Sequence, residues 1–202
     1  VDAFLRAGLA VRGLQQAPKA DRYTLVRRAY LDLLGLPPTP DEVRAFVEDR
    51  APDAWEKLIE RLLASPHYGE RWGRHWLDVA RYADSNGYEH DYDRPNAWRY
   101  RDYVIQAFNK DTPFDVFLQE QIAGDVLFPA DPEGVVATGF IAAGPWDFVG
   151  HQELREGTTD KNITRILDRD DMVAATMSTF TSMTVHCARC HDHKFDPIPQ
   201  AD

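Results

Sequence analysis

The chain has 202 residues, with 23 Lys and Arg against 33 Asp and Glu, so its formal net charge is −10. This acidic balance argues against a nucleic-acid partner, because neutralising phosphates requires clustered Lys and Arg. The sequence contains no apolar run as long as a membrane span, and its two cysteines are too few for a disulfide framework. We expect residues 1–202 to form a single domain taken from a longer protein.

Apolar residues recur at helical spacing through the first part of the chain. Thr39-Pro40-Asp41-Glu42 is typical of a helix start, with Thr39 as N-cap, Pro40 at the first helical position and Glu42 as the capping-box partner. Ser65-Pro66 repeats the cap-then-proline pattern. The pattern predicts helices over 2–12, from Asp21 to Leu34, from Pro40, from Asp53, and over 66–82.

The second part continues in the same way, with fewer clear signals. We expect a helix from Pro95 to about residue 109, and another that is capped by Thr112 and ends at Gly124. Residues 144–159 look irregular, and a last helix, capped by Asp168 or Asp170, leads directly to Cys187. No alternation of period two is long enough for a sheet. The prediction is an all-α fold, a single compact bundle of seven to nine helices with a C-terminal Cys-x-x-Cys-His segment.

Both cysteines lie in that segment, as Cys187-Ala188-Arg189-Cys190-His191. This spacing is the attachment signature of c-type haem, in which each thiol forms a thioether with a porphyrin vinyl group. The adjacent His191 then serves as the proximal ligand of the iron. The motif therefore predicts covalent haem at Cys187, Cys190 and His191.

Three other readings of the motif stay open. Zinc is one, because Cys187, Cys190, His191 and His193 offer four suitable ligands, although structural zinc sites usually draw ligand pairs from two separated segments. A dithiol redox motif is another, but it lacks the βαβ context of thioredoxin-like folds. The third is a purely structural pair of core thiols.

A bound haem makes further demands on the chain. The second ring nitrogen of His191 needs an acceptor, for which we expect a backbone carbonyl between Phe195 and Pro199. Phe195 packs either on the porphyrin or in the core. The sixth iron position is open, with these candidates: Met172, Met177, Met183, His67, His75, His90 and His151.

Residues 71–103 hold a second group of side chains, in which arginines alternate with Trp72, Trp76 and Trp98. The group could bind an anion, either haem propionates or an anionic substrate such as a glycan, because arginine forks match carboxylates and sulfates. It could equally consist of Arg–Asp/Glu pairs between two packed helices, with Trp in the core, and we favour that interpretation. No Ser-His-Asp order, phosphate loop or paired-carboxylate motif indicates a particular enzyme.

Five stretches resemble one family along the whole chain. They are RRAYLDLLGLPPTP at 27–40, LLASPHYGERW at 62–72, RYADSNGY at 81–88, RPNAWRYRD at 94–102 and CARCHDHKFDPIP at 187–199. The chain is similar to the cytochrome c-like domain of large multidomain planctomycete proteins, a domain otherwise labelled as of unknown function. His186 departs from the small or polar residue expected there and slightly favours the metal alternative.

The resemblance implies haem attachment at Cys187, Cys190 and His191, and a periplasmic or other extracytoplasmic setting. It also implies further domains in the same chain, among them a possible redox partner. From these implications and the motif we expect a haem c domain that transfers electrons within a larger oxidoreductase. The alternative is a zinc-binding structural module, or a glycan- or anion-binding module that uses the arginine-rich helices.

Overall fold

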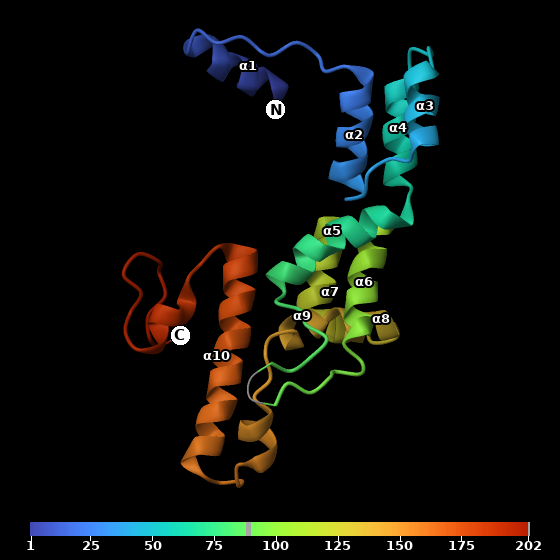
Figure 1. The fold of residues 1–202 in the computed structure, drawn as a ribbon. Coiled ribbons are helices and arrows are strands. Elements are labelled where there is room, and N and C mark those ends of the chain that lie inside the picture. The colour runs from blue at the N-terminus through green and yellow to red at the C-terminus, as the bar shows by residue number, and fades with distance from the viewer. Residues whose placement is uncertain (88–89, 202) are drawn as a thin grey trace. The chain divides into compact units, whose positions relative to one another are not determined.

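The computed structural model describes residues 1–87 and 90–201; Tyr88, which ends one of the matched stretches, lies outside them. Within these residues the chain forms ten α-helices, a π-helical turn and a 3-10 helix, and its only β pairing is an isolated bridge between Ser85 and Asp93. The all-α class is confirmed. The chain divides into two compact units, Val1–Ala64 and the part from Ser65 onward (Figure 1). The expectation of a single domain stays a prediction.

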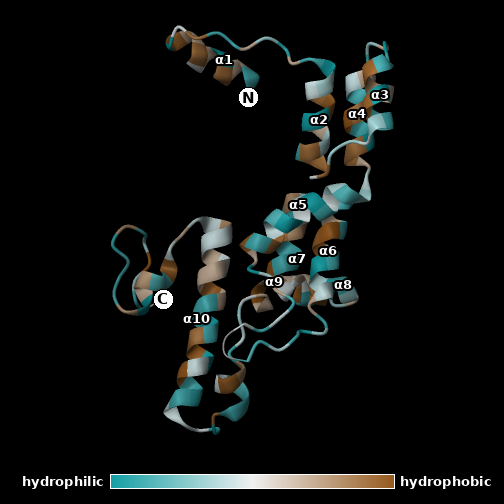
Figure 2. Ribbon diagram, viewed as in Figure 1, coloured by the Kyte–Doolittle hydropathy of each residue, from teal (hydrophilic) through white to brown (hydrophobic). Residues whose placement is uncertain are grey.

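The first unit consists of four helices: α1 (Asp2–Val11), α2 (Arg22–Leu33), α3 (Pro40–Glu48) and α4 (Ala54–Leu63). Its core lies between α2, α3 and α4, where the fully buried Val26 belongs to one apolar cluster with Phe46 and Leu58. Helix α1 has no buried residue, although the hydropathy colours of Figure 2 mark part of its ribbon as hydrophobic. The stability of this unit therefore depends on α2, α3 and α4.

The predicted capping box at Thr39 is confirmed. The Glu42 backbone N–H donates to Thr39 Oγ1 at 3.3 Å, and the Thr39 backbone N–H donates to Glu42 Oε2 at 2.7 Å. Burial raises the pKa of Glu42, but the hydrogen bonds from the backbone and hydroxyl of Thr39 outweigh it, so the pKa falls below its ordinary value of 4.5. The box thus favours the ionised carboxylate at the positive end of α3.

Thr39→Ala is expected to destabilise α3 by about 1 kcal/mol, because the Glu42 backbone N–H loses Thr39 Oγ1 as its acceptor and Glu42 Oε2 loses the hydroxyl donor. Native-state hydrogen exchange of the α3 amides measures this loss as faster exchange at neutral pH. Exchange in the helices beyond Ser65 serves as the internal control and should not change. Equal α3 exchange in the variant and the parent contradicts the prediction.

The pH dependence of this effect follows from the lowered pKa of Glu42. A carboxyl group whose pKa is lower in the folded state contributes its full stability above the unfolded pKa and loses it as the pH falls through the folded pKa. The loss of α3 stability in Thr39→Ala, relative to the parent, should therefore be complete above about pH 5 and become smaller below about pH 4. A difference that grows on acidification would contradict the assigned role of Glu42.

The second unit begins with α5 (Pro66–Val79), α6 (Trp98–Asn109) and α7 (Phe114–Leu127), followed by the short α8 (Pro132–Ala137) and α9 (Gly139–Ala142). Its core gathers aromatic rings around Trp76, whose ring lies 4.8 Å from that of Phe117 and 5.9 Å from that of Phe140. The buried Gln121 accepts hydrogen bonds from Tyr100 and Trp76 through Oε1, at 2.7 and 3.3 Å. This polar group holds α5, α6 and α7 in register inside an apolar core.

The boundaries of these helices differ from the sequence expectation for local reasons. Helix α5 ends at Val79, because Arg81 adopts a left-handed φ of 58°. Helix α6 begins at Trp98, because a turn occupies 95–97. Thr112 caps nothing, since the N-cap of α7 is Pro113.

Gly124 does not end α7, which continues to Leu127 across a kink at Ala123. A Cβ on Gly124 would lie 2.4 Å from the carbonyl oxygen of Gly134 in α8. The glycine therefore permits the close approach of two helices rather than a helix stop.

The last helix is much longer than expected. Helix α10 (Thr159–Thr181) begins nine residues before Asp168 and is capped by Thr158, whose hydroxyl accepts from the Lys161 backbone N–H at 3.3 Å. Asp168 and Asp170 lie inside it, because both carboxylates pair with side chains of other segments. The region before α10, expected to be irregular, contains the π-helical turn η1 (Val149–Glu153). None of the described helices, α10 included, combines the length and apolar character needed to cross a bilayer.

Candidate functional site

The Cys-x-x-Cys-His segment follows α10 on a separate element. Ser182, at the C-cap of α10, takes a left-handed φ of 57°, so the helix stops there instead of leading directly to Cys187. The chain then forms the 3-10 helix η2 (Val185–Arg189), which contains Cys187 and lies beside α10 (Figure 1). The backbone N–H groups of Cys190 and His191 both donate to the Cys187 carbonyl oxygen, at 3.2 and 3.3 Å. One tight turn therefore carries both thiols and the imidazole.

All three side chains of the motif are open to solvent. Cys187 and Cys190 are free, exposed thiols, which contradicts the reading as a structural pair in the core. His191 is also exposed, and its Nδ1 lies 2.7 Å from the carbonyl oxygen of Asp192. A carbonyl oxygen only accepts, so Nδ1 carries the proton and Nε2 presents its lone pair. The acceptor is thus the carbonyl oxygen of Asp192, the next residue in the sequence, and not a carbonyl of residues 195–199 as we expected.

His193 has a different task from His191. Its side chain is only 7% exposed, and its Nδ1 accepts hydrogen bonds from the backbone N–H groups of Phe195, at 3.2 Å, and Asp196, at 2.7 Å. Nδ1 therefore holds the lone pair, and Nε2–H faces Thr184 Oγ1 at 3.4 Å. The ring stabilises the loop after the motif. Among the described residues no three His, Cys, Asp or Glu side chains gather as metal ligands, so His193 does not join the cysteines in one cluster.

The His193 loop offers a direct test of this role. His193→Ala removes the acceptor of two backbone N–H groups and should speed hydrogen exchange at Phe195 and Asp196 about tenfold. His193→Asn is the matched control, because its Oδ1 can replace Nδ1 as acceptor and should keep most of the protection. Amide exchange followed by NMR measures both. Equal exchange in the two variants contradicts the role.

Two acidic residues of α10 tie neighbouring segments to the helix. Asp170 Oδ2 lies 3.6 Å from both His186 Nδ1 and Arg189 Nη1, which attaches η2 to the middle of α10. Asp171 receives both hydrogen bonds of its pair from Arg81 Nη1, at 2.6 and 2.7 Å. A cavity of about 180 Å³ lies next to these contacts and is lined by Met183 and His186, among others.

The remaining predicted side chains are dispersed. Phe195 is 83% exposed, so the reading as a core aromatic is wrong, and Lys194 Nζ lies 5.2 Å from the centre of its ring. Of the candidates for the sixth iron position, Met183 lines the cavity beside η2, and Met172 lines a smaller one. The four histidines each have a neighbour of their own: His67 with Glu70, His75 with Trp72, His90 with Tyr92 and His151 with Asp168.

Among the described residues, the arginines of 71–103 do not form the pairs between two packed helices that we favoured. Arg101 pairs with the adjacent Asp102 at 2.9 Å, whereas the partner of Arg81 is Asp171 of α10 rather than a residue of the neighbouring helix. Arg94 donates to the carbonyl oxygens of Ala143 and Gly144, at 3.2 and 2.7 Å. Burial lowers the pKa of Arg94. Trp76 is packed against the core as expected, whereas Trp72 and Trp98 are exposed.

Comparison with known proteins places these features in a family. The model of the PSCyt2 family, described as a protein of unknown function (DUF1549), matches residues 1–202. The chain belongs to the PSCyt2 family. No curated protein and no solved structure matches it. The expected membership in a domain family of unknown function is confirmed, and the function of this PSCyt2 domain has to follow from its side chains.

The PSCyt2 fold also places together residues that the sequence pattern did not connect. His151 in η1 pairs through Nε2 with Asp168 of α10, and its ring stacks on Trp146 with centroids 3.9 Å apart. Lys161 is 2% exposed and donates to the carbonyl oxygens of Gly150, at 3.1 Å, and of His151. This buried ammonium group therefore holds the π-helical turn against α10. His151 and Asp168 are seventeen residues apart in the sequence, and no motif indicates that they pair.

Proposed function

We propose that this domain carries a covalently attached c-type haem at Cys187 and Cys190, with His191 as the proximal ligand. The observation that carries the proposal is the state of one turn: two exposed free thiols, and an imidazole whose Nδ1–H is held by a carbonyl oxygen. This arrangement leaves Nε2 of His191 as a free lone pair, which is the atom an iron ligand must offer. The residues present therefore fit the group.

The chain's own residues have separate tasks in this proposal. The thiols of Cys187 and Cys190 form the covalent links, and exposure leaves both accessible to the attachment machinery. The Asp192 carbonyl oxygen fixes the ring orientation of His191, so that Nε2 faces outward as the ligand atom. Asp170 holds η2 against α10 through His186 and Arg189. These contacts fix the position of the turn relative to α10.

A bound haem supplies a one-electron iron couple, and its exposed anchor suits exchange with a partner. The covalent attachment, the family resemblance and the exposed turn support electron transfer with a redox partner protein or a further domain of the same chain. The same considerations support a periplasmic or other extracytoplasmic setting. The zinc alternative has weaker support, because the lone pair of His193 Nδ1 is already engaged by two backbone N–H groups.

Expression of the domain with and without a cytochrome c maturation system tests the proposal. With maturation, the protein should show a Soret band that survives acid–acetone extraction, because thioether bonds are not broken by it. Without maturation, metal analysis of the same chain should find less than one equivalent of zinc. A colourless protein with two free thiols after maturation overturns the haem proposal, and one equivalent of zinc released by a chelator with loss of stability supports the alternative.

A further inference from the structure

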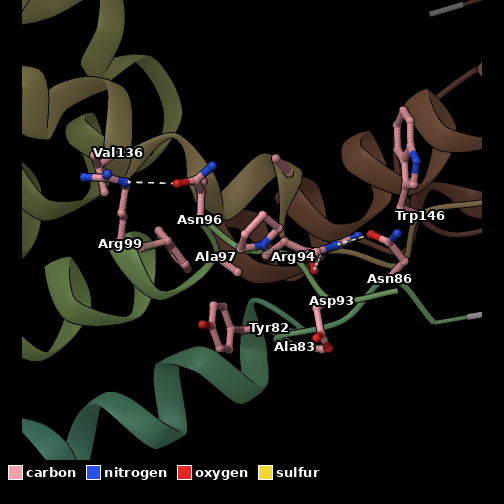
Figure 3. Close-up of a pocket in the computed structure, with 15 residues that line it drawn as sticks. Tyr82, Ala83, Asn86, Asp93, Arg94, Asn96, Ala97, Arg99, Val136 and Trp146 are labelled. Carbon is pink, nitrogen blue, oxygen red and sulfur yellow. Dashed lines mark hydrogen bonds between the residues drawn. The ribbon is translucent and has the colours of Figure 1, made fainter. Parts of the chain in front are cut away.

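A second site lies away from the Cys-x-x-Cys-His turn, in a cavity of about 520 Å³. It is an open cavity lined by the segment between α5 and α6, by the start of α6 and by α8 and α9, and Figure 3 shows the side chains around it. Its walls are mainly apolar and aromatic and include Tyr82, Tyr100 and Trp146. This size, with few polar groups on apolar walls, is typical of small-molecule sites.

Two asparagines at the cavity are oriented by arginines. Arg94 Nε donates to Asn86 Oδ1 at 2.9 Å, and Arg99 Nε lies 3.5 Å from Asn96 Oδ1, as the dashed lines in Figure 3 mark. Because each amide oxygen faces a donor, the NH2 group of each asparagine points away from its arginine. The other nitrogens of Arg94 are held by the Ala143 and Gly144 carbonyls. The amide NH2 groups and the exposed guanidinium of Arg99 are thus fixed donors with capacity for a ligand.

The charge of the lining differs from that of the protein. Among the described lining residues, Arg94 and Arg99 carry positive charge and Asp93 alone carries negative charge. The whole chain has a formal charge of −10. A local positive excess inside an acidic protein attracts an anion to this point rather than to the general surface. Donors outnumber acceptors here, so a fitting ligand is rich in acceptor oxygens.

The aromatic wall is held in place before any ligand arrives. Trp146 stacks on His151, and its backbone N–H donates to the Asn86 carbonyl oxygen at 2.8 Å. The Tyr82 hydroxyl donates to Asp84 at 2.5 Å, which directs its polar end to that carboxylate. The half-buried rings of Tyr82 and Trp146 therefore offer apolar surface that a ligand need not order, and the buried Tyr100 supports them from behind.

We propose that this cavity binds one acidic pyranose residue, with its ring against Tyr82 and Trp146 and its acidic group at Arg99. A pyranose matches both halves of the site: its C–H face suits aromatic surface, and its ring and hydroxyl oxygens accept from the amides of Asn86 and Asn96. A carboxylate or sulfate on the ring pairs with the guanidinium. An aromatic acid fills the walls but leaves the amide donors without partners, which costs affinity. The site does not depend on haem.

Titration of the full chain with four probes by calorimetry or ligand-observed NMR tests this proposal. The probes are glucuronate and galactose 6-sulfate as acidic sugars, glucose as the neutral sugar and benzoate as the acid without sugar hydroxyls. We expect at least one acidic sugar to bind at least about tenfold more tightly than either glucose or benzoate. The stronger of the two acidic sugars identifies whether carboxylate or sulfate is preferred.

Two variants locate the binding. Arg99→Gln should lower the affinity for the acidic sugar about tenfold and leave the affinity for glucose unchanged. Asn96→Ala should lower the affinity for both sugars. Arg74→Gln is the matched control, because Arg74 is exposed on α5 and does not line the cavity. Benzoate binding as tight as the sugars, no acidic-sugar binding below about 10 mM, or equal loss in Arg99→Gln and Arg74→Gln each overturns the proposal. Haem loading is irrelevant to these outcomes, so failure here is distinguishable from failure of the haem proposal.

Discussion

Replacing Cys187 and Cys190 together by serine is expected to abolish covalently retained haem. Serine keeps the size and exposure of each side chain but has no thiol to form a thioether, so haem should be removed completely by acid–acetone extraction. Either single replacement leaves one thiol and should retain covalent haem, with an altered pyridine haemochrome band from the unreacted vinyl group. The measurement is the Soret absorbance of the protein after extraction, normalised to protein concentration.

His191 provides the second arm of the same experiment. His191→Gln should keep the thioether bonds, because both thiols remain, but change the visible spectrum and the reduction potential, because the iron loses its proximal nitrogen. Lys194→Gln is the control, since Lys194 is an exposed residue three positions after His191 and has no role in holding the haem. It should leave the spectrum unchanged. If both glutamine variants alter the spectrum alike, His191 is not the proximal ligand.

Local signals in the sequence predicted the starts of several helices correctly. The capping box of Thr39 and Glu42 forms as expected, because its partners are three residues apart and need no tertiary contact. Ser65 likewise accepts from the His67 backbone N–H at 3.4 Å, and Gly35 after α2 has a φ of 71°. Each of these depends only on backbone geometry within one turn.

The errors arose where distant side chains decide the outcome. Asp168 and Asp170 look like N-caps, but His151, His186 and Arg189 engage them inside a continuous α10. Gly124 looks like a helix stop, but it is small so that Gly134 can approach. The sequence around these residues does not indicate which distant residue each of them contacts, because the contacts form only when the chain folds.

The same distinction applies to the candidate sites. The spacing of Cys187, Cys190 and His191 was visible at once, whereas the carbonyl of Asp192 as acceptor and the structural role of His193 depend on the path of the loop. The arginine-rich stretch was visible too, but its cavity needs Trp146, which lies 43 residues beyond the end of that stretch. The arginine-rich stretch therefore identifies the hydrogen-bond donors of the cavity but not the aromatic residues, such as Trp146, that line it.

Gly69→Ala is expected to destabilise the unit from Ser65 onward by roughly 2 kcal/mol. A Cβ at Gly69 would lie 2.3 Å from the carbonyl oxygen of Ile105 in α6, and backbone cannot move aside as a side chain can. Overpacking of this kind costs about 3 kcal/mol, and the better helix propensity of alanine returns about 1 kcal/mol. The Gly69 N–H also donates to Asn109 Oδ1 at 2.8 Å, a bond that separation of α5 from α6 would break.

Gly73→Ala, one turn further along α5, isolates the cause of that loss. The nearest atoms to a Cβ there would be Ile105 Cγ1 at 3.4 Å, Val104 Cγ1 at 3.5 Å and Ile105 Cα at 3.7 Å, which are ordinary contacts, so the variant should be within about 0.5 kcal/mol of the parent or slightly more stable. Both substitutions give the helix the same propensity gain on the face toward α6, and only the one at Gly69 would force an atom into a clash with backbone. Hydrogen exchange of the α5 and α6 amides, measured in the full chain, separates them. Equal destabilisation by the two variants would mean that α5 and α6 are not held by this backbone contact, and that the support of Tyr100 in the aromatic wall has another origin.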